Sequence, residues 1–182
     1  MKALPAAVFL DRDGTIIEDG HYISRPDQVR LIDGAAEAIA RINAALIPAI
    51  VVTNQSGIGR GLFTTADYER LKSHLGVLLA ARGAHIDDSY HCPHAPEDYC
   101  DCRKPGIALF ERAARDHPEV VLGNSLYIGD RWRDISPGIA FGGDGVLVPG
   151  GDTPPDDIAR ARESGRVAPS IGVALDWYLC TN

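Results

Sequence analysis

The chain has 182 residues, and its content of 45% hydrophobic and 24% charged residues is typical of a globular protein. Its formal net charge of -7 argues against a nucleic-acid-binding protein, whose affinity depends on a basic surface. No apolar run approaches the roughly 20 residues that span a bilayer, and the first run contains Pro5 and leads into charged residues, unlike a signal peptide. We expect a single domain over residues 1–182, a cytoplasmic monomer that binds neither nucleic acid nor membrane.

The first half of the chain alternates apolar segments of strand length with segments of helical periodicity. Residues 6–10 are predicted as a buried strand, and the apolar positions of residues 35–46 recur at helical spacing. Residues 49–53 are predicted as a second buried strand. Thr64 and Asp67 have the spacing of a capping box that starts a helix. The apolar face of that helix consists of Leu71, Leu75, Leu78 and Leu79.

The second half continues this alternation. Strands are predicted at residues 86–91, 126–129 and 145–148, and a helix over 107–114. The segments that are rich in Gly, Pro and polar residues are predicted as loops: 54–61, 92–105 and 150–157. The alternation favours an α/β fold, a three-layer, Rossmann-like, doubly wound parallel sheet with helices on both faces. The intervals between elements leave little or no room for a cap domain.

Polar residues follow three of the predicted strands. Asp11 and Asp13 follow the first strand, Thr53 and Asn54 end the second, and Asp130 follows a later one. Ligands of open α/β sheets bind beyond the carboxyl ends of the strands, and an extended backbone points Asp11 and Asp13 the same way. A lone Asp-x-Asp is readily explained as a polar exit from a strand, but polar groups at three strand ends favour a functional site.

Four segments, in order, resemble the motifs of the haloacid-dehalogenase phosphatase superfamily: LDRDGT, VVTNQSG, CRKP and IGDRWRD. The match extends over residues 6–135, roughly three quarters of the chain, and four ordered motifs are far more specific than any single one. The resemblance implies that Asp11 attacks phosphorus and forms an aspartyl-phosphate, while Asp13 acts as general acid and then as general base.

The same resemblance implies which residues bind phosphate and metal. Thr53 and Lys104 would hold the oxygens of the transferring phosphoryl group. Mg²⁺ would bind Asp11, the backbone carbonyl of Asp13, and Asp130, since it prefers hard oxygen ligands.

Three further charged residues lie near predicted elements. Arg131 either adds positive charge to the phosphate site or is a solvated surface arginine. Asp134 is predicted to cap the next helix or to orient Lys104, and Asp33 is predicted to cap the helix that begins at residue 35.

A cluster of cysteines and a histidine precedes the CRKP segment. The four residues form two pairs, Cys92-x-His94 and Cys100-x-Cys102, which offer the three sulfurs and one nitrogen of a closed tetrahedral zinc site. Such a site is structural, and we expect it to fix the loop before Lys104. The rival interpretation is three free cysteines beside a surface histidine. His91 is an alternative nitrogen ligand whose side chain should point away from that of Cys92, and Cys180 is predicted to be a packed apolar residue.

The Cys/His loop followed by CRKP resembles a small group of heptose-bisphosphate and histidinol-phosphate phosphatases, and residues 53–64 are closer to the heptose members. This resemblance implies removal of the 7-phosphate of D-glycero-D-manno-heptose 1,7-bisphosphate, in the biosynthesis of nucleotide-activated heptose for the lipopolysaccharide core, with histidinol phosphate as the alternative substrate. The residues expected to contact this small phosphosugar are Asp19, Gly20, His21, Tyr22, Asn54, Gln55, Ser56, Arg60, Arg103 and Arg131. Arg60 and Arg103 are the candidates for its second phosphate, although Arg60 is equally explained as an ordinary loop arginine.

Two functions from other classes fit the sequence less well. A phospho-receiver signalling domain also phosphorylates an aspartate at a strand end, but it has no use for a general acid at Asp13. A zinc-dependent nucleic-acid module is disfavoured by the negative charge and by the lack of interleaved aromatic and basic residues.

Overall fold

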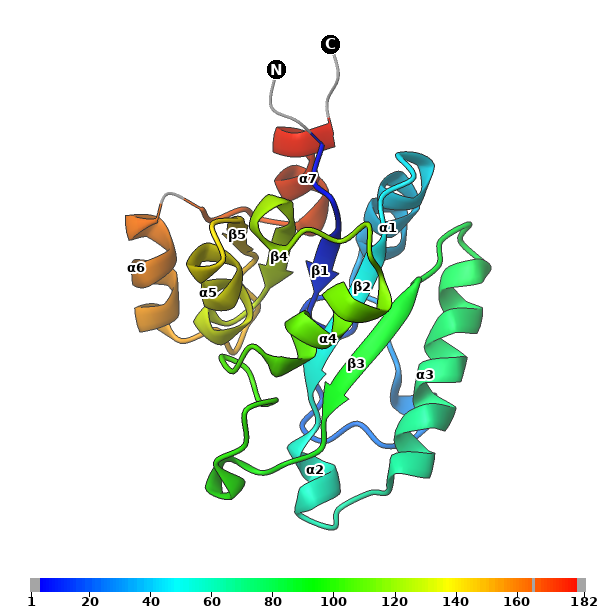
Figure 1. The fold of residues 1–182 in the computed structure, drawn as a ribbon. Coiled ribbons are helices and arrows are strands. Elements are labelled where there is room, and N and C mark those ends of the chain that lie inside the picture. Colours follow the sequence, from blue (N-terminus) through cyan, green and yellow to red (C-terminus); the bar gives the residue numbers. More distant parts are fainter. Residues whose placement is uncertain (1–3, 165, 180–182) are drawn as a thin grey trace.

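The computed structural model of the chain describes residues 4–164 and 166–179. At its centre is a five-stranded parallel sheet in the order β3-β2-β1-β4-β5 (Figure 1). The strands are β1 (Val8–Leu10), β2 (Ala49–Asn54), β3 (Asp88–Cys92), β4 (Leu126–Gly129) and β5 (Asp144–Leu147). The α/β fold with a parallel sheet, predicted from the alternation of elements, is confirmed.

Helices cover both faces of this sheet. The α-helices are α1 (Ala35–Ala44), α2 (Ser56–Gly59), α3 (Thr65–Ala80), α4 (Ala108–Asp116), α5 (Trp132–Ala140), α6 (Pro155–Glu163) and α7 (Ile171–Leu179). The described residues also form short 3-10 helices, η1 (Pro26–Gln28), η2 (Pro96–Asp98) and η3 (Leu122–Asn124). α1, α3 and α7 pack on one face, α4 and α5 pack on the other, and α6 lies beside α5 at the β5 edge (Figure 1).

The alternation of side chains along β1 explains why both faces need cover. Val8 and Leu10 join the core beneath α1, α3 and α7, whereas Phe9 faces α4. On the α4 face Phe9, Phe110 and Tyr127 form an aromatic cluster with ring centroids 4.9 to 5.4 Å apart. Each such pair adds about 0.5–1.5 kcal/mol beyond burial, so this cluster stabilises the packing of α4 on β1 and β4.

The order of the strands brings the polar strand ends together. β1 lies between β2 and β4, with Leu10 in register with Val51 on one side and Ile128 on the other. The residues that follow these positions, Asp11 and Asp130 among them, therefore emerge side by side at one edge of the sheet. No described helix is both long and apolar enough to cross a membrane.

The structure corrects several details of the sequence prediction. The segment predicted as a Gly-rich loop at 54–61 contains the short helix α2, and the loop predicted at 150–157 ends where α6 begins at Pro155. Asp33 does not cap α1, because the N-cap is Gly34, at φ +81°, and no side-chain hydrogen bond caps the helix. The capping box of Thr64 and Asp67 is confirmed. Cys180 lies outside the described residues.

Candidate active site and metal centre

Lys104 joins two carboxylates at the carboxyl end of the sheet. Its Nζ lies 2.7 Å from Asp11 Oδ1 and 2.8 Å from Asp134 Oδ1, and it donates a hydrogen bond to the carbonyl of Val52. All three charged side chains are buried. Burial disfavours the ammonium charge, but Asp11 and Asp134 outweigh this and hold the pKa of Lys104 above its ordinary value. Lys104 is thus a fixed positive charge beside Asp11.

Asp130 adds a third buried carboxylate. Carboxylate oxygens of Asp11, Asp130 and Asp134 all lie within 4.8 Å of one another. Burial, with the charges of Asp11 and Asp134, raises the pKa of Asp130 to about 7. A divalent cation would relieve the mutual repulsion of these groups, and carboxylate oxygens are the ligands that Mg²⁺ prefers. The donor set therefore fits such an ion.

Asp134 performs both of the roles proposed for it from the sequence. Its Oδ1 pairs with Lys104, while its Oδ2 accepts a hydrogen bond from the backbone N–H of Arg131 at 3.0 Å, which caps α5. Arg131 is not a solvated surface arginine, because its Nε lies 3.0 Å from Asp130 Oδ2 and the side chain is only 20% exposed.

The loop after β1 approaches Asp130 closely. Gly14 has φ +79°, and a Cβ at this position would lie 2.7 Å from Asp130 Oδ2. Only glycine lets the backbone pass here without displacing that carboxylate.

A hydrogen-bond network fixes Asp13 at the edge of the site. The Nη2 and Nε of Arg12 donate to the carboxylate of Asp13 at 2.9–3.3 Å. Gln55 Nε2 donates to Asp13 Oδ2 at 2.8 Å and to Thr53 Oγ1 at 2.9 Å, and Gln55 Oε1 accepts from Arg12 Nη2 at 3.0 Å. The network joins the ends of β1 and β2, so the Asp13 carboxylate is held beside the buried Thr53 hydroxyl.

Asn54 holds the backbone at Lys104. Its Oδ1 accepts from the Lys104 N–H at 3.0 Å, and its Nδ2 donates to the Lys104 carbonyl at 3.2 Å. The end of β2 therefore sets the position from which the Lys104 side chain reaches Asp11.

Two adjoining cavities open at these residues. The smaller has a volume of about 40 Å³ and is lined by Asp11, Asp13, Asp19, Thr53, Asn54, Lys104, Asp130, Arg131, Arg133 and Asp134. The larger has a volume of about 230 Å³ and is lined by Arg12, Asp13, Asp19, His21, Tyr22, Ile23, Asn54, Gln55, Ser56, Gly57 and Arg133. The smaller cavity has the size and the donors for a phosphoryl group, and the larger one has room for a small sugar.

The residues predicted to contact substrate fall into two groups. Those that line one or both cavities are Asp19, His21, Tyr22, Asn54, Gln55, Ser56 and Arg131. The other three line neither cavity: Gly20 is exposed, Arg60 pairs with Glu97 at 3.0 Å, and Arg103 Nη1 donates to the His94 carbonyl at 3.4 Å.

Arg133 lines both cavities, and the sequence analysis did not select it. It lies in the first turn of α5, three residues after Asp130. Among the described residues it has no hydrogen-bond or ion-pair partner, whereas Lys104, Arg131 and Arg12 are each paired with a carboxylate of the site. Its position within the IGDRWRD segment, close to Asp130, could have identified Arg133 as a candidate site residue from the sequence.

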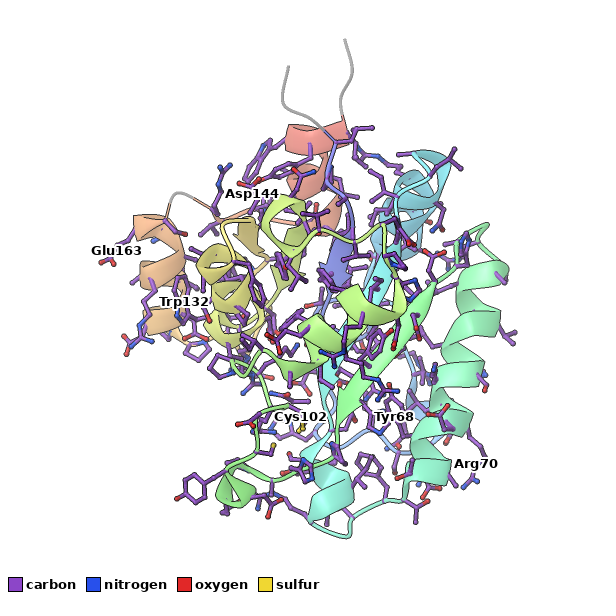
Figure 2. The ribbon with its side chains drawn as sticks, in the orientation of Figure 1. Tyr68, Arg70, Cys102, Trp132, Asp144 and Glu163 are labelled. Carbon is purple, nitrogen blue, oxygen red and sulfur yellow. The ribbon has the colours of Figure 1, made fainter. Side chains whose placement is uncertain are left out.

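The four predicted zinc ligands also come together, in the segment between β3 and α4, where Figure 2 labels Cys102. The sulfur of Cys102 lies 3.0 Å from that of Cys92 and 3.5 Å from that of Cys100, and His94 Nδ1 lies 3.2 Å from Cys102 Sγ. In a tetrahedral site with zinc–sulfur bonds of about 2.3 Å, sulfurs are about 3.8 Å apart, so a small shift of these atoms admits the ion.

The pKa values of the three thiols move in different directions. Burial raises the pKa values of Cys92 and Cys102. Burial opposes the thiolate of Cys100, but hydrogen bonds from Cys102 and from the Arg103 backbone lower the pKa of Cys100 to about 7. The thiolate is the form that binds zinc. His91 lies outside the cluster, as expected, with its ring 4.1 Å from that of Tyr68.

Comparison with known proteins agrees with this arrangement. A family model described as HAD-hydrolase-like matches residues 101–174. The chain is 36% identical to the D-glycero-beta-D-manno-heptose-1,7-bisphosphate 7-phosphatase of Escherichia coli (strain K12), over 98% of this chain and 90% of that protein.

Solved structures show the same similarity. The D,D-heptose 1,7-bisphosphate phosphatase from B. bronchiseptica, complexed with magnesium and phosphate, superposes with a TM-score of 0.84 at 32% identity, over 95% of this chain and 98% of that one. The corresponding phosphatase from Burkholderia thailandensis gives a TM-score of 0.68 at 30% identity, over 94% and 97% of the two chains.

Proposed function

Because the chain belongs to the haloacid-dehalogenase-like hydrolases, in the family of the heptose-1,7-bisphosphate 7-phosphatases, we propose that it is a Mg²⁺-dependent phosphatase that removes the 7-phosphate of D-glycero-D-manno-heptose 1,7-bisphosphate. The observation that carries the proposal is the placement of Asp11 in a phosphoryl-sized cavity, with Lys104 on one side and Asp130 on the other. A carboxylate flanked in this way has the surroundings that a phosphate-attacking nucleophile needs.

In the proposed reaction, Asp11 attacks phosphorus through the carboxylate oxygen that does not pair with Lys104. The bond from phosphorus to the sugar oxygen breaks as the bond to Asp11 forms, and water later hydrolyses the aspartyl-phosphate. Lys104 and Thr53 hold the phosphoryl oxygens, whose charge redistributes during the transfer. A bound Mg²⁺, held by Asp11, the Asp13 carbonyl and Asp130, would screen the repulsion between the carboxylate and the phosphate.

Asp13 protonates the departing sugar oxygen and then takes a proton from the attacking water. Its carboxylate lines both cavities, so it lies between the phosphoryl group and the sugar. Arg12 and Gln55 fix its orientation in both steps, since they bind the carboxylate from the side. This arrangement supports turnover rather than the long-lived phosphate of a signalling receiver.

The sugar would occupy the larger cavity. Asp19, His21 and Ser56 offer hydrogen-bonding groups for its hydroxyls. We propose that Arg133 contacts the phosphorylated substrate where the two cavities meet, because it is the cation there without a partner among the described residues. Arg103 and Arg60 remain our candidates for the second phosphate, and both would have to release their present partners.

The Cys/His cluster would bind a structural zinc ion. Its last ligand, Cys102, is two residues from Lys104, and Asn54 holds the Lys104 backbone from the other side. Zinc would order this loop before the substrate arrives.

A phosphate-release assay tests the proposed substrate. We expect the highest kcat/KM with D-glycero-β-D-manno-heptose 1,7-bisphosphate or its α anomer, with the 7-phosphate as the group released. A higher kcat/KM with histidinol phosphate would assign the alternative activity, and no steady release from any phosphate ester would exclude a phosphatase.

We further propose that residues 1–182 form one domain that acts as a cytoplasmic monomer. One continuous sheet supports a single domain, and cysteines held for zinc suit a reducing compartment. Light scattering during gel filtration should give the mass of one chain, 19.5 kDa.

A further inference from the structure

The turn from β4 into α5 carries several residues of the phosphoryl site. Asp130 directly follows β4, Arg131 is the N-cap of α5, and Asp134 lies in the first turn of that helix. All three line the smaller cavity. A movement of this turn would therefore displace the carboxylate of Asp130, a proposed Mg²⁺ ligand, together with its ion-pair partner Arg131.

Thr153 holds this turn at the carbonyl of Asp130. The pairing of β4 with β5 ends at Gly129 and Leu147, so the backbone of Asp130 lies beyond the ladder. The buried hydroxyl of Thr153 donates a hydrogen bond to the Asp130 carbonyl at 2.8 Å and accepts one from the Gly150 N–H at 2.9 Å. Thr153 thus supports the backbone just past the end of the sheet.

The peptide between Asp130 and Arg131 is bonded at both of its polar groups. Thr153 binds its carbonyl oxygen, and Asp134 Oδ2 accepts a hydrogen bond from its N–H at 3.0 Å. A peptide plane held at its donor and at its acceptor cannot rotate without breaking one of these bonds. The two bonds therefore restrict the direction in which the Asp130 side chain leaves the backbone.

Asp157 holds the next N–H of the turn. The first N–H groups of an α-helix have no partner within the helix. Trp132 is the first residue of α5, and its N–H donates to Asp157 Oδ2 at 2.9 Å. Asp157 lies in the first turn of α6, which packs beside α5. Thr153 and Asp157 together bind the backbone on both sides of Arg131.

The segment that carries Thr153 and Asp157 is suited to this task. Pro154 and Pro155 lie between them, and the proline rings fix the φ angles of the chain there. Asp130 and Gly150 also line a cavity of about 330 Å³, so close packing does not hold Asp130 on that side. The hydrogen bonds from the segment therefore determine where Asp130 lies.

We propose that Thr153 and Asp157 are positioning residues for the metal site, which act through the backbone of the β4–α5 turn to hold the Asp130 carboxylate beside Asp11. Neither side chain is among those that line the two substrate cavities, so each acts through the turn and not on the substrate. This role rests on the proposed Mg²⁺-dependent function and concerns the affinity of the site for its ion.

Binding of Mn²⁺, a paramagnetic substitute for Mg²⁺, to the zinc-loaded protein tests this role. Electron paramagnetic resonance measures the free ion and needs no turnover. Thr153→Val keeps the shape of the side chain but removes both hydrogen bonds of the hydroxyl. It should raise the Kd for Mn²⁺ about tenfold, because the partners that orient metal ligands contribute to metal affinity. Thr153→Ser keeps a hydroxyl and should bind Mn²⁺ as the wild type does.

Asp157→Ala is a second variant, which acts on the other side of Arg131. It should raise the Kd for Mn²⁺ about threefold or more, whereas Asp157→Asn keeps an acceptor oxygen and should bind as the wild type does. In both weakened variants the Mg²⁺ concentration for half-maximal activity should rise by the same factor as the Kd. At saturating Mg²⁺ kcat should change little, because the reacting groups are intact once the ion is bound.

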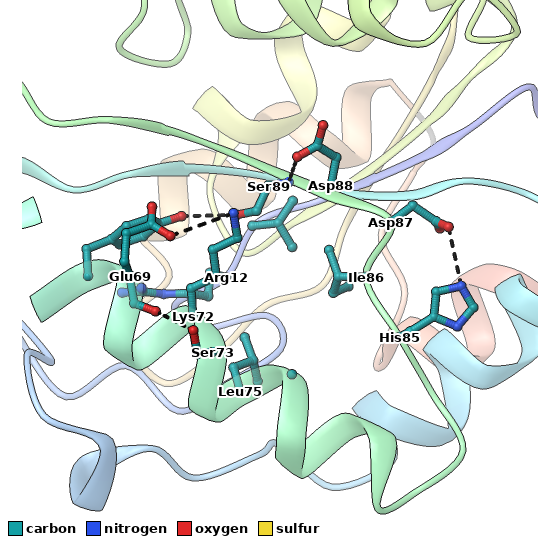
Figure 3. Close-up of a pocket in the computed structure, with 13 residues that line it drawn as sticks. Arg12, Glu69, Lys72, Ser73, Leu75, His85, Ile86, Asp87, Asp88 and Ser89 are labelled. Carbon is teal, nitrogen blue, oxygen red and sulfur yellow. Dashed lines mark hydrogen bonds and ion pairs between the residues drawn. The ribbon is translucent and has the colours of Figure 1, made fainter. Parts of the chain in front are cut away.

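Two matched controls lie away from the turn. Ser73→Ala also removes a hydroxyl that donates to a backbone carbonyl, that of Glu69 at 2.9 Å, but in α3 beside the cavity that Figure 3 shows. Asp156→Ala removes the exposed acidic neighbour of Asp157 in the same turn of α6. Both controls should bind Mn²⁺ with wild-type affinity.

The proposal is overturned if Thr153→Val and Asp157→Ala fold and bind Mn²⁺ with wild-type affinity, or if Thr153→Ser is weakened as much as Thr153→Val. If Thr153→Val does not fold, the two Asp157 variants alone decide. The proposed activity fails separately: a wild-type protein that binds Mn²⁺ but releases no phosphate would exclude the phosphatase, while the Mn²⁺ affinities of the variants would still decide the role of Thr153 and Asp157.

Discussion

The carboxylate cluster and the Cys/His cluster both bring together ligand atoms for a metal, but in opposite surroundings. Asp11 and Asp130 are buried where β1 and β4 end, and Asp134 is buried in the first turn of α5. Lys104 pairs with Asp11 and Asp134, and Arg131 pairs with Asp130. Of the four Cys/His residues, Cys92 alone is buried, and the segment that carries the others has only the short turn η2 as regular structure among its described residues.

Because of this difference, we expect the two sites to have different functions. The sheet positions the carboxylates without help from a metal, so an ion there is free to act on a substrate. The loop has few other interactions to hold it, so the metal itself would supply the order. The oxygen site should therefore control the chemistry, and the sulfur site should control the position of Lys104.

The largest expected effect comes from the nucleophile. Asp11→Asn should lower kcat on the order of 10⁴-fold, because the amide cannot attack phosphorus, while substrate still binds. Asp33→Asn, at an exposed site before α1, is the matched control and should keep wild-type kinetics. Steady-state kinetics and calorimetric binding check both variants, and an Asp11→Asn enzyme that retained a tenth of the activity would remove Asp11 from this role.

A smaller loss is expected when the loop loses its metal. Cys100→Ser should bind no zinc, and kcat/KM should fall by about 10- to 100-fold through both a lower kcat and a higher KM, since Lys104 is no longer held in place. Added Mg²⁺ should not restore activity. Asp101→Asn, an exposed neighbour, should keep both zinc and kinetics. Wild-type kinetics in a zinc-free Cys100→Ser enzyme would break the proposed link between the two sites.

The smallest effect should come from the cation between the two cavities. Arg133→Gln should raise KM about tenfold with little change in kcat, because an exposed arginine contributes mainly to binding. Arg133→Lys should lie between this variant and the wild type, and Arg115→Gln on α4 should have no effect. An unchanged KM in Arg133→Gln would show that Lys104, Arg131 and Arg12 suffice to bind the substrate without Arg133.

The core of the fold and the strand-end site were predictable because they depend on short local patterns. The runs that became β1, β2 and β4 are buried on both faces, so they are continuously apolar, and polar residues such as Asp11 and Asp130 mark where they end. The two Cys/His pairs were predictable for a similar reason, since their spacing alone suggests a common metal.

Elements without a clear periodicity were missed. α6 buries only Ala161, so it shows no apolar stripe, and α7 is apolar on nearly every side, so its pattern does not distinguish a helix from a strand. Arg133 was missed because its place beside both cavities depends on the orientation of α5, which the sequence pattern does not give. Arg60 was selected from its loop, but its pairing with Glu97 depends on the fold of the Cys/His segment.

Chelation with simultaneous measurement of activity and zinc content tests the division of labour between the two metal sites most directly. Mild treatment with EDTA should abolish phosphate release while about one zinc ion per chain remains bound, since three thiolates and an imidazole hold zinc far more tightly than carboxylates hold Mg²⁺. Added Mg²⁺ alone should then restore full activity. Loss of activity in step with loss of zinc, or recovery with zinc and not with Mg²⁺, would contradict the assignment of catalysis to Asp11, Asp13 and Asp130.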